Sequence, residues 1–355
     1  MPNATDDTEP DSTTVPWTPP RPAEIPALHT SLRAWLGHPF FFKVTIDALD
    51  AGQGTIIPAA ANPLEAAVIL HQEETRRLGS AELYAVDEEM TAQALAAGAR
   101  LPDWSVQPAD LPAEQGFLVF DSPIGHSEAT DGLIAPIVAC SWGPSPHCSP
   151  PAGAVWLTFW SAPVLDRLVQ AGIEAGLDPV EAQREVKRGS PPLVWDDEAL
   201  VCWSAGEPDI PTTPRYIPSE EVSGVIAKER TLPWIQTVLA AWLLIQEPAI
   251  VEITEQRASR PERRRAERAG RPLPPVRVVS IHRRVSTATR PAEPSGRTVN
   301  VRFRVRGFWR DQPYGKGRAL RKRTWIPEHW RGPEDAPVLI RPRVTVVEAP
   351  PEPAD

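Results

Sequence analysis

Residues 231–246 read TLPWIQTVLAAWLLIQ, the most apolar helical pattern in the chain. The large side chains recur at steps of three and four residues, as an α-helix with one apolar face requires: Trp234, Val238, Ala241, Trp242 and Ile245. A face this broad has to be buried. The stretch is shorter than the roughly 18 residues of a membrane span. We therefore expect a helix that packs on a folded domain or joins two.

The charged residues divide the chain on either side of this helix. Residues 257–343 carry 24 Lys and Arg against 7 Asp and Glu, a net charge of +17. Residues 1–256 carry 13 against 36, a net charge of −23, and the whole chain has a net charge of −9. This asymmetry predicts either a polyanionic partner for the basic part or docking of the basic part on the acidic part.

Length and composition predict the domain organisation. A chain of 355 residues is long enough for two domains, and its 43 prolines favour linkers and tails. We expect an α+β fold in which a disordered tail (1–26) precedes an acidic mixed α/β domain (27–226). A long apolar connecting helix (227–256), a basic helix with a small arginine-rich antiparallel β module (257–347) and a second tail (348–355) then follow.

Local signals predict the elements of the acidic domain. Side chains that cap helices begin two of them, Asn62 before PLEAAVILHQEETRRLG and Asp87 before EEMTAQALAAG, and Asp178 begins the second member of a helical pair at 163–188. Five apolar runs indicate strands: PFFFKVTI, AELYAV, QGFLVFDSPI, LIAPIVACSW and GAVWLTFWSA. LVWDDEALVCWSA is interpreted as a further hairpin. These strands and helices do not alternate regularly, which favours α+β over a doubly wound sheet.

The basic part begins with ASRPERRRAERAGR, which has six arginines between Arg260 and Arg271 and predicts a short helix capped by Ser259. Four candidate strands follow: PVRVVSIHRRV, RTVNVRFRVRGFW, RKRTWIPEHW and VLIRPRVTVV. Turn glycines lie between them, as in YGKGR at 314–318. This pattern predicts a small antiparallel sheet or half-open barrel.

Within this sheet, VNVRFRVRGFWR at 299–310 alternates apolar and basic residues. In a strand, Val299, Val301, Phe303 and Val305 would share the core face, and Asn300, Arg302, Arg304 and Arg306 the other. Alternate residues are about 7 Å apart, a spacing that suits successive phosphates. Aromatic residues lie in the same segment: Trp309, Tyr314, Trp325 and Trp330.

Arginine together with aromatic rings is typical of single-stranded nucleic-acid binding, because cations meet phosphates and rings stack on bases. We therefore predict a nucleic-acid-binding protein, with DNA and RNA equally open. Its site residues would be Arg302, Arg304, Arg306, Trp309, Arg310, Lys316, Arg318, Arg321, Arg323 and Trp325. Two alternatives remain: the tryptophans are core residues with a rim of arginines, or the basic sheet docks on an acidic protein or on the chain's own acidic domain.

A family resemblance lies in the same region. VRGFWRDQPYGKGR followed by TWIPEHWRG resembles the C-terminal signature of uncharacterised proteins from actinobacterial and phage genomes. The resemblance covers residues 260–345 and implies a phage or mobile-element origin without an established activity. Phe308 stands where that signature commonly has histidine.

The chain contains no Gly-rich phosphate loop, no GxSxG and no HExxH, so the sequence predicts no catalytic residue, cofactor or bound metal. Three weaker patterns leave a metal-dependent nuclease or RNase toxin as a further alternative: Glu185 with Lys187, the acids Asp196, Asp197 and Glu198 of an expected turn, and His282 with His329. A zinc site of Cys140, His147, Cys148 and Cys202 and a DNA-reading helix at 177–188 have less support.

The N-terminal MPNATDDTEPDS lacks a basic stretch followed by an apolar core, as a secretory signal would have. We expect a cytoplasmic protein with no membrane partner.

Overall fold

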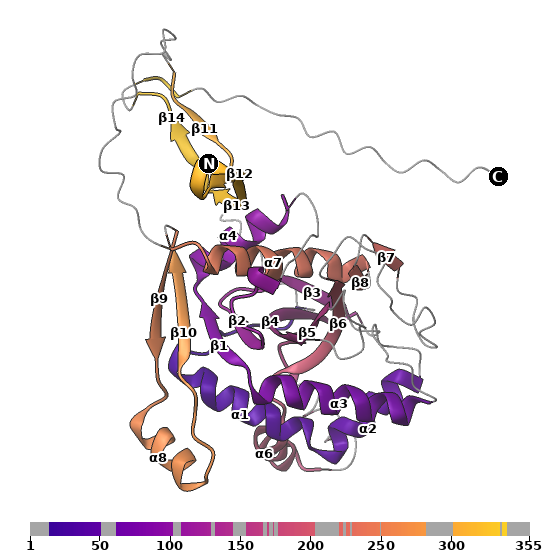
Figure 1. Ribbon diagram of the computed structural model, residues 1–355. Helices are drawn as coiled ribbons and strands as arrows, with labels where there is room; N and C mark the ends of the chain where they lie inside the picture. The colour runs from indigo at the N-terminus through magenta and orange to yellow at the C-terminus, as the bar shows by residue number, and fades with distance from the viewer. Residues whose placement is uncertain are drawn as a thin grey trace, which may run out of the picture.

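The computed structural model of the 355-residue chain describes residues 14–50, 62–101, 108–128, 132–144, 154–165, 177–202, 220–222, 225–227, 229–248, 250–281, 301–333 and 336–338, with the single residues 169 and 173. Helices and strands in these ranges combine around one large mixed sheet (Figure 1). No helix in this part of the chain is long and apolar enough to cross a membrane.

The described strands of the large sheet lie in the order β7-β8-β6-β5-β4-β2-β1-β10-β9, and β3 pairs with β4. Their bounds are β1 Glu82–Val86, β2 Gly116–Phe120, β3 Gly125–Glu128, β4 Ile134–Pro144, β5 Ala154–Ser161, β6 Val194–Cys202, β7 Glu220–Val222, β8 Val225–Ala227, β9 Val251–Gln256 and β10 Val276–Ile281. β1 pairs in parallel with both β2 and β10, and the other pairs are antiparallel.

The parallel centre of the sheet is covered on both faces. All of β2 is buried, as is β1 after its first residue, which agrees with their continuous apolar sequences. Helix α4 (Glu88–Gly98) makes the crossover from β1 to β2. Asp87 begins it, since its side chain accepts a hydrogen bond of 2.7 Å from the backbone N–H of Met90.

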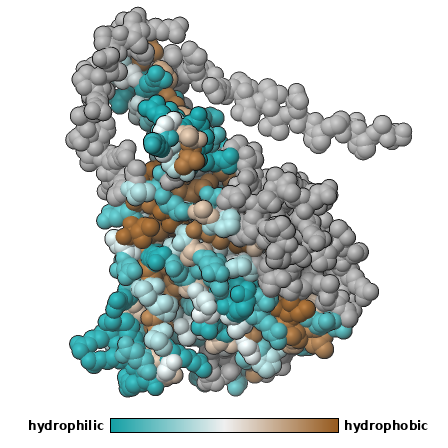
Figure 2. Space-filling view, viewed as in Figure 1, coloured by the Kyte–Doolittle hydropathy of each residue, from teal (hydrophilic) through white to brown (hydrophobic). Residues whose placement is uncertain are grey.

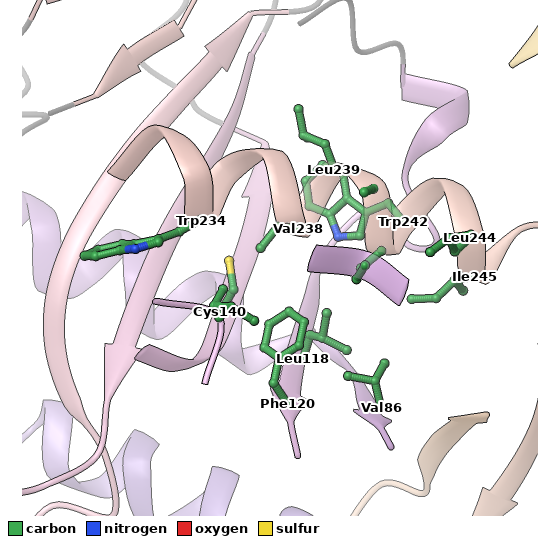
Figure 3. Close-up of a cluster of buried hydrophobic side chains, with 14 of the residues drawn as sticks. Val86, Leu118, Phe120, Cys140, Trp234, Val238, Leu239, Trp242, Leu244 and Ile245 are labelled. Carbon is green, nitrogen blue, oxygen red and sulfur yellow. The ribbon is translucent and has the colours of Figure 1, made fainter. Parts of the chain in front are cut away.

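Helices α4 and α7 (Leu232–Ile245) cover one face of the sheet (Figure 1). Figure 3 shows Trp234, Val238 and Trp242 of α7 above Leu118 and Phe120 of β2. The two helices approach closely at Gly98, where a Cβ atom would lie 2.9 Å from the backbone of Gln236. The main core of the protein lies between this helical layer and the sheet.

The expected long connecting helix is not present among the described residues of 227–256. The apolar stretch does form a helix, but α7 has 14 residues, and residues 251–256 form strand β9 instead. Ten of the residues of α7 are buried, on more than one side of the helix. A helix with apolar residues on most sides belongs inside a core, and α7 packs both on the sheet and against α4.

The other face of the sheet carries α1 (Ile25–Leu36), α2 (Pro39–Asp50) and α3 (Pro63–Gly79) (Figure 1). The prediction that PFFFKVTI is a strand was wrong, because this segment is the first part of α2. Phe41, Thr45 and Leu49 follow one another at four-residue steps, so they share one helix face, and both apolar residues are buried. Its aromatic and β-branched residues suit a strand, but this helical spacing decides the outcome.

The structure confirms the predicted helix starts. Asn62, Asp87, Asp178 and Ser259 each accept a hydrogen bond from a backbone N–H in the first turn of α3, α4, α6 (Pro179–Gly189) and α8 (Arg260–Arg268). Short 3-10 turns lie at Pro22–Glu24 (η1), Pro108–Asp110 (η2) and Glu229–Thr231 (η3). The first helix of the predicted pair at 163–188 lies almost wholly outside the described residues.

The start of the described chain packs against the sheet. Val15 is buried, and its backbone N–H donates to the carbonyl of Ile134 at 2.9 Å. The indole N–H of Trp17 donates to the carbonyl of Asp121 at 3.0 Å. Residues 14–26, part of the tail that the composition predicts to be disordered, therefore extend the fold.

The basic part of the chain does not form one small sheet. Strand β10, from PVRVVSIHRRV, is an inner member of the large sheet beside β1. The remaining described strands form two short ladders, β11 (Phe303–Val305) with β14 (His329–Arg331) and β12 (Phe308–Tyr314) with β13 (Leu320–Ile326). The fourth expected strand, VLIRPRVTVV, lies outside the described residues except for Val338, which forms a bridge with Arg302.

Candidate nucleic-acid interface

Strands β12 and β13 form a regular antiparallel hairpin, which runs from the pair Phe308–Ile326 to the pair Tyr314–Leu320. The turn η4 (Lys316–Arg318) joins them. Gly315 and Gly317 have φ values of 77° and 66° there, a region that favours glycine, and Arg318 adopts 56°. The YGKGR segment therefore forms the predicted turn.

One face of the hairpin is fixed to the body of the protein by two opposed tryptophans. The indole N–H of Trp309 donates to the carbonyl oxygen of Ala97 at 2.9 Å, and that of Trp325 donates to Oε1 of Gln93 at 3.2 Å. Both acceptors lie on α4, four residues apart and so on one face of that helix. Trp325 is 2% exposed and belongs to the same core as Trp242 of α7.

The strand VNVRFRVRGFWR is interrupted at this anchor. β11 ends at Val305, β12 begins at Phe308, and the buried Gly307 lies between them. A Cβ atom on Gly307 would lie 2.3 Å from the Trp325 ring, so only glycine lets the chain pass so close to the ring. The predicted row of Arg302, Arg304 and Arg306 therefore ends just before this point, and only Arg304 of the three lies within β11.

The other face of the hairpin is open to solvent. Phe308, Tyr314 and Leu320 are 41%, 47% and 53% exposed, and Arg310 lies on the same face between the two aromatic rings. Figure 2 shows apolar residues gathered where the hairpin meets the body, and polar residues interspersed with apolar ones over the rest of it. The hairpin thus separates a buried tryptophan face from an exposed face of aromatic and basic residues.

The short ladder β11–β14 pairs Phe303 with Arg331 and Val305 with His329. Arg302 and Arg304 already have partners. The guanidinium of Arg302 lies 5.3 Å from the centre of the Trp330 ring, in a cation–π contact, and Arg304 forms an ion pair with Glu328. The imidazole of His329 is exposed, with Nδ1 3.0 Å from the carbonyl of Pro327.

The ten residues predicted to bind nucleic acid divide into two groups. Arg306, Arg310, Lys316, Arg318 and Arg321 are exposed, and none forms an ion pair with the part of the chain that the structure describes. The others are engaged within the protein. Arg302 and Arg304 have the contacts above, Arg323 lies 4.0 Å from the Asp311 carboxylate, and Trp309 and Trp325 anchor the hairpin.

The sequence did not identify which aromatic residues are exposed. Trp309 and Trp325 were expected to stack on bases, but their rings face α4, and Phe308, Tyr314 and Trp330 are open to solvent instead. Alternation along β12 could have assigned Phe308 and Trp309 to opposite faces. Which face is buried depends on docking against α4, a contact that joins residues far apart in the sequence.

The described residues behind the enzymatic alternatives lie on separate elements. Glu185 and Lys187 lie on helix α6 rather than on a strand, while His282 falls outside the described residues, as do His147 and Cys148. The Cys140 thiol is buried in the core, which raises its pKa. The described residues contain no group of three or more His, Cys, Asp and Glu that could hold a metal ion.

The acids Asp196, Asp197 and Glu198 lie within strand β6, not in the turn that was expected. They lie beside a register shift, where Trp195 pairs with Trp160 and Asp197 with Phe159. The Asp197 carboxylate accepts hydrogen bonds from Arg230 at 3.2 Å and from the Thr231 hydroxyl at 3.2 Å. Burial raises the pKa of Asp196 above its usual value.

A second cluster of buried polar side chains joins α3 to the sheet. Glu74 accepts hydrogen bonds from Ser141 at 2.5 Å and Thr158 at 2.8 Å, and it also pairs with Arg77. The Arg77 guanidinium lies over the Trp156 ring, and neither it nor Glu74 is exposed. These contacts fix α3 on the sheet.

Comparison with protein-family models and with curated proteins finds no match to this chain. The resemblance of residues 260–345 to actinobacterial and phage proteins, and the mobile-element origin that it implies, therefore stay predictions from the sequence.

Proposed function

We propose that the protein binds single-stranded nucleic acid through the β12–β13 hairpin. The observation that carries this proposal is the division of the hairpin into two faces. Its buried face docks through Trp309 and Trp325, while Phe308, Arg310 and Tyr314 on its open face remain exposed. A bound strand would stack bases on the exposed rings and place phosphates beside the arginines.

Further exposed cations lie at the turn end of the hairpin, where Arg321, opposite Pro313, is on the same side as Trp325 but is open to solvent. Lys316 and Arg318 lie in η4, and Arg321 follows at the start of β13. Each is a candidate phosphate contact, since none is engaged in an ion pair with a described residue. Arg302 and Arg304, by contrast, would have to leave Trp330 and Glu328 to bind a phosphate. We therefore assign the phosphate contacts to the hairpin and its turn.

The main alternative, that the basic part docks on the chain's own acidic domain, describes strand β10, where Arg277 forms an ion pair with Glu82 of β1, but it has less support for the hairpin. The hairpin does contact the body, but the contact consists of two tryptophans and their hydrogen bonds to α4. Charge attraction would instead place the arginines against acidic side chains. Because the five exposed cations stay outside this contact, docking of the hairpin leaves them available.

The test compares two triple variants of the full-length protein that remove the same charge. Arg310→Gln and Arg321→Gln change the hairpin and Arg306→Gln changes the link that leads into it, while Arg33→Gln, Arg184→Gln and Lys187→Gln change exposed cations on α1 and α6. Binding of labelled single-stranded DNA and RNA is followed by fluorescence anisotropy over a range of salt concentrations. The hairpin variant should lower the slope of log affinity against log salt by about 2, since each contact with a single strand contributes about 0.7.

The control variant should bind as the unchanged protein does. Equal losses in both variants would show that only overall charge matters, and undiminished binding by the hairpin variant would exclude this site. If the unchanged protein fails to bind either strand at low salt, the proposal is wrong.

A further inference from the structure

A second basic surface lies on α8, in the loop that connects β9 to β10. The two strands pair without a break from Val251–Ile281 to Gln256–Val276, so a short turn could join them. The chain instead inserts residues 257–275 there, including the helix Arg260–Arg268. In Figure 1 this insertion projects from one end of the β9–β10 pair, away from the β12–β13 hairpin.

Helix α8 forms without a buried core of its own. Ser259 accepts a hydrogen bond from the backbone N–H of Glu262, whose side chain accepts one from the backbone N–H of Ser259, so the two residues make a capping box. None of its residues is buried, and residues 257–271 carry seven arginines against two glutamates. The helix therefore contributes little to the packing of the protein, and its composition needs another explanation.

Four of the five arginines of the helix gather on one side. With about 100° between consecutive residues, Arg260, Arg264, Arg265 and Arg268 fall within an arc of about 140°. All four are exposed, whereas Glu262, Arg263 and Ala266 on the opposite side are half-buried. The outward face thus has four cations and no acidic residue, and Glu267 lies at its margin.

We propose that this face of α8 binds the phosphate backbone of double-stranded nucleic acid. The partner is inferred from the chemistry that the face offers and from what it lacks. It has four guanidinium groups, which suit phosphates, but no exposed aromatic ring on which an unpaired base could stack. It also lacks the apolar side that a helix lying in a membrane surface would need.

The surface is separate from the hairpin, so this inference does not depend on the proposed single-strand site. The hairpin combines rings with cations, whereas α8 offers cations alone. The two surfaces are therefore expected to prefer different forms of nucleic acid, and either proposal can fail while the other holds.

The experiment uses the full-length protein with Arg264→Gln, Arg265→Gln and Arg268→Gln, beside the hairpin triple variant described above. Each is titrated with a DNA duplex and with a single strand of the same length over a range of salt concentrations. The α8 variant should lower the duplex slope of log affinity against log salt by about 2.7, because each contact with B-form DNA contributes about 0.9. Its single-strand binding should stay unchanged, and the hairpin variant should show the reverse.

A variant with Lys at these three positions keeps the charge and should restore most of the duplex binding. Because α8 buries none of its residues, circular dichroism should show all the variants folded. Duplex binding that survives the Gln variant, or no duplex binding by the unchanged protein at low salt, would overturn the proposal. Loss of binding to polyglutamate without loss of duplex binding would also overturn it, since α8 would then recognise an acidic protein.

Discussion

Glycine next to tryptophan recurs at the close contacts of this protein. A Cβ atom on Gly116 would lie 2.1 Å from the Trp142 ring, and one on Gly307 would lie 2.3 Å from the Trp325 ring. Both rings are buried, so neither can turn away without opening the core. At Gly307 the contact also bears on the proposed function, since Trp325 holds the hairpin that carries the proposed site.

Replacing Gly307 with Ala should therefore displace Trp325 and loosen the hairpin. Overpacking of this kind costs about 1–3 kcal/mol. Thermal unfolding followed by tryptophan fluorescence should show a lower melting temperature and an altered native spectrum. Gly189→Ala is the matched control, because nothing lies within 4 Å of the added Cβ atom and the residue has no unusual φ. A Gly307→Ala protein as stable as the control would contradict the contact.

The buried histidine His29 makes stability depend on pH. Burial, aided by nearby Arg33, lowers the pKa of His29 from 6.5 to about 4, and Nε2 lies 2.9 Å from the carbonyl of Leu78. In the unfolded chain the imidazole takes up a proton as the pH falls below 6.5, while in the folded protein it stays neutral until about pH 4. Its contribution is complete above pH 6.5 and is lost as the pH falls to about 4.

The free energy of unfolding should therefore fall by up to about 3 kcal/mol across this window because of His29. Chemical denaturation measured above and within the window gives the size of the decrease. In His29→Gln, which can still donate to the Leu78 carbonyl, the decrease should be smaller by a similar amount. An unchanged pH dependence in this variant would show that His29 does not titrate in this way.

At the scale of elements, sequence reasoning succeeded where the signal is local. The caps at Asn62, Asp87, Asp178 and Ser259 lie beside the helices that they begin, and each was predicted. It failed where the structure of an element depends on contacts with residues far along the chain. Strand β10 pairs with β1, a contact that no local pattern contains, and β3 (GHSE) is too short and polar to recognise.

The same reason explains why the buried face of the β12–β13 hairpin was not predicted. Alternation predicts two faces for β12, but the face that is buried depends on Ala97 and Gln93 of α4. The exposed cations of the proposed site were therefore predictable from composition, whereas the anchoring contacts of Trp309 and Trp325 were not. This kind of limit applies to any element that docks on a distant part of its own chain.

Removal of one of its tryptophan anchors tests whether the hairpin is a separate element docked on the body. Trp325→Ala removes a buried ring and a hydrogen bond to Gln93, and loss of a large core side chain costs about 3–5 kcal/mol. Amide hydrogen exchange should become faster throughout β12 and β13 while the inner strands β2 and β4 keep their protection. Equal loss of protection in β2 and β4 would mean that the hairpin is not a separate docked element.

At the scale of the whole molecule, the mixed sheet separates two basic surfaces. The β12–β13 hairpin docks through α4 on the layer that α4 and α7 form, and α8 projects from the connection between β9 and β10 (Figure 1). The acidic residues belong chiefly to the part of the chain before residue 257, which supplies most of the sheet and helices. The net charge of −9 therefore conceals two cationic sites that would direct a polyanion to defined places.

The most direct test of the proposed function is photochemical cross-linking of a single-stranded oligonucleotide to the unchanged protein, followed by peptide mapping. Adducts should form on the peptides that contain Phe308 and Tyr314, whose rings are exposed beside the cations of the hairpin. They should disappear at high salt and in the Arg306, Arg310 and Arg321 triple variant. Adducts confined to other parts of the chain, or none at low salt, would contradict the proposal that the hairpin binds single strands.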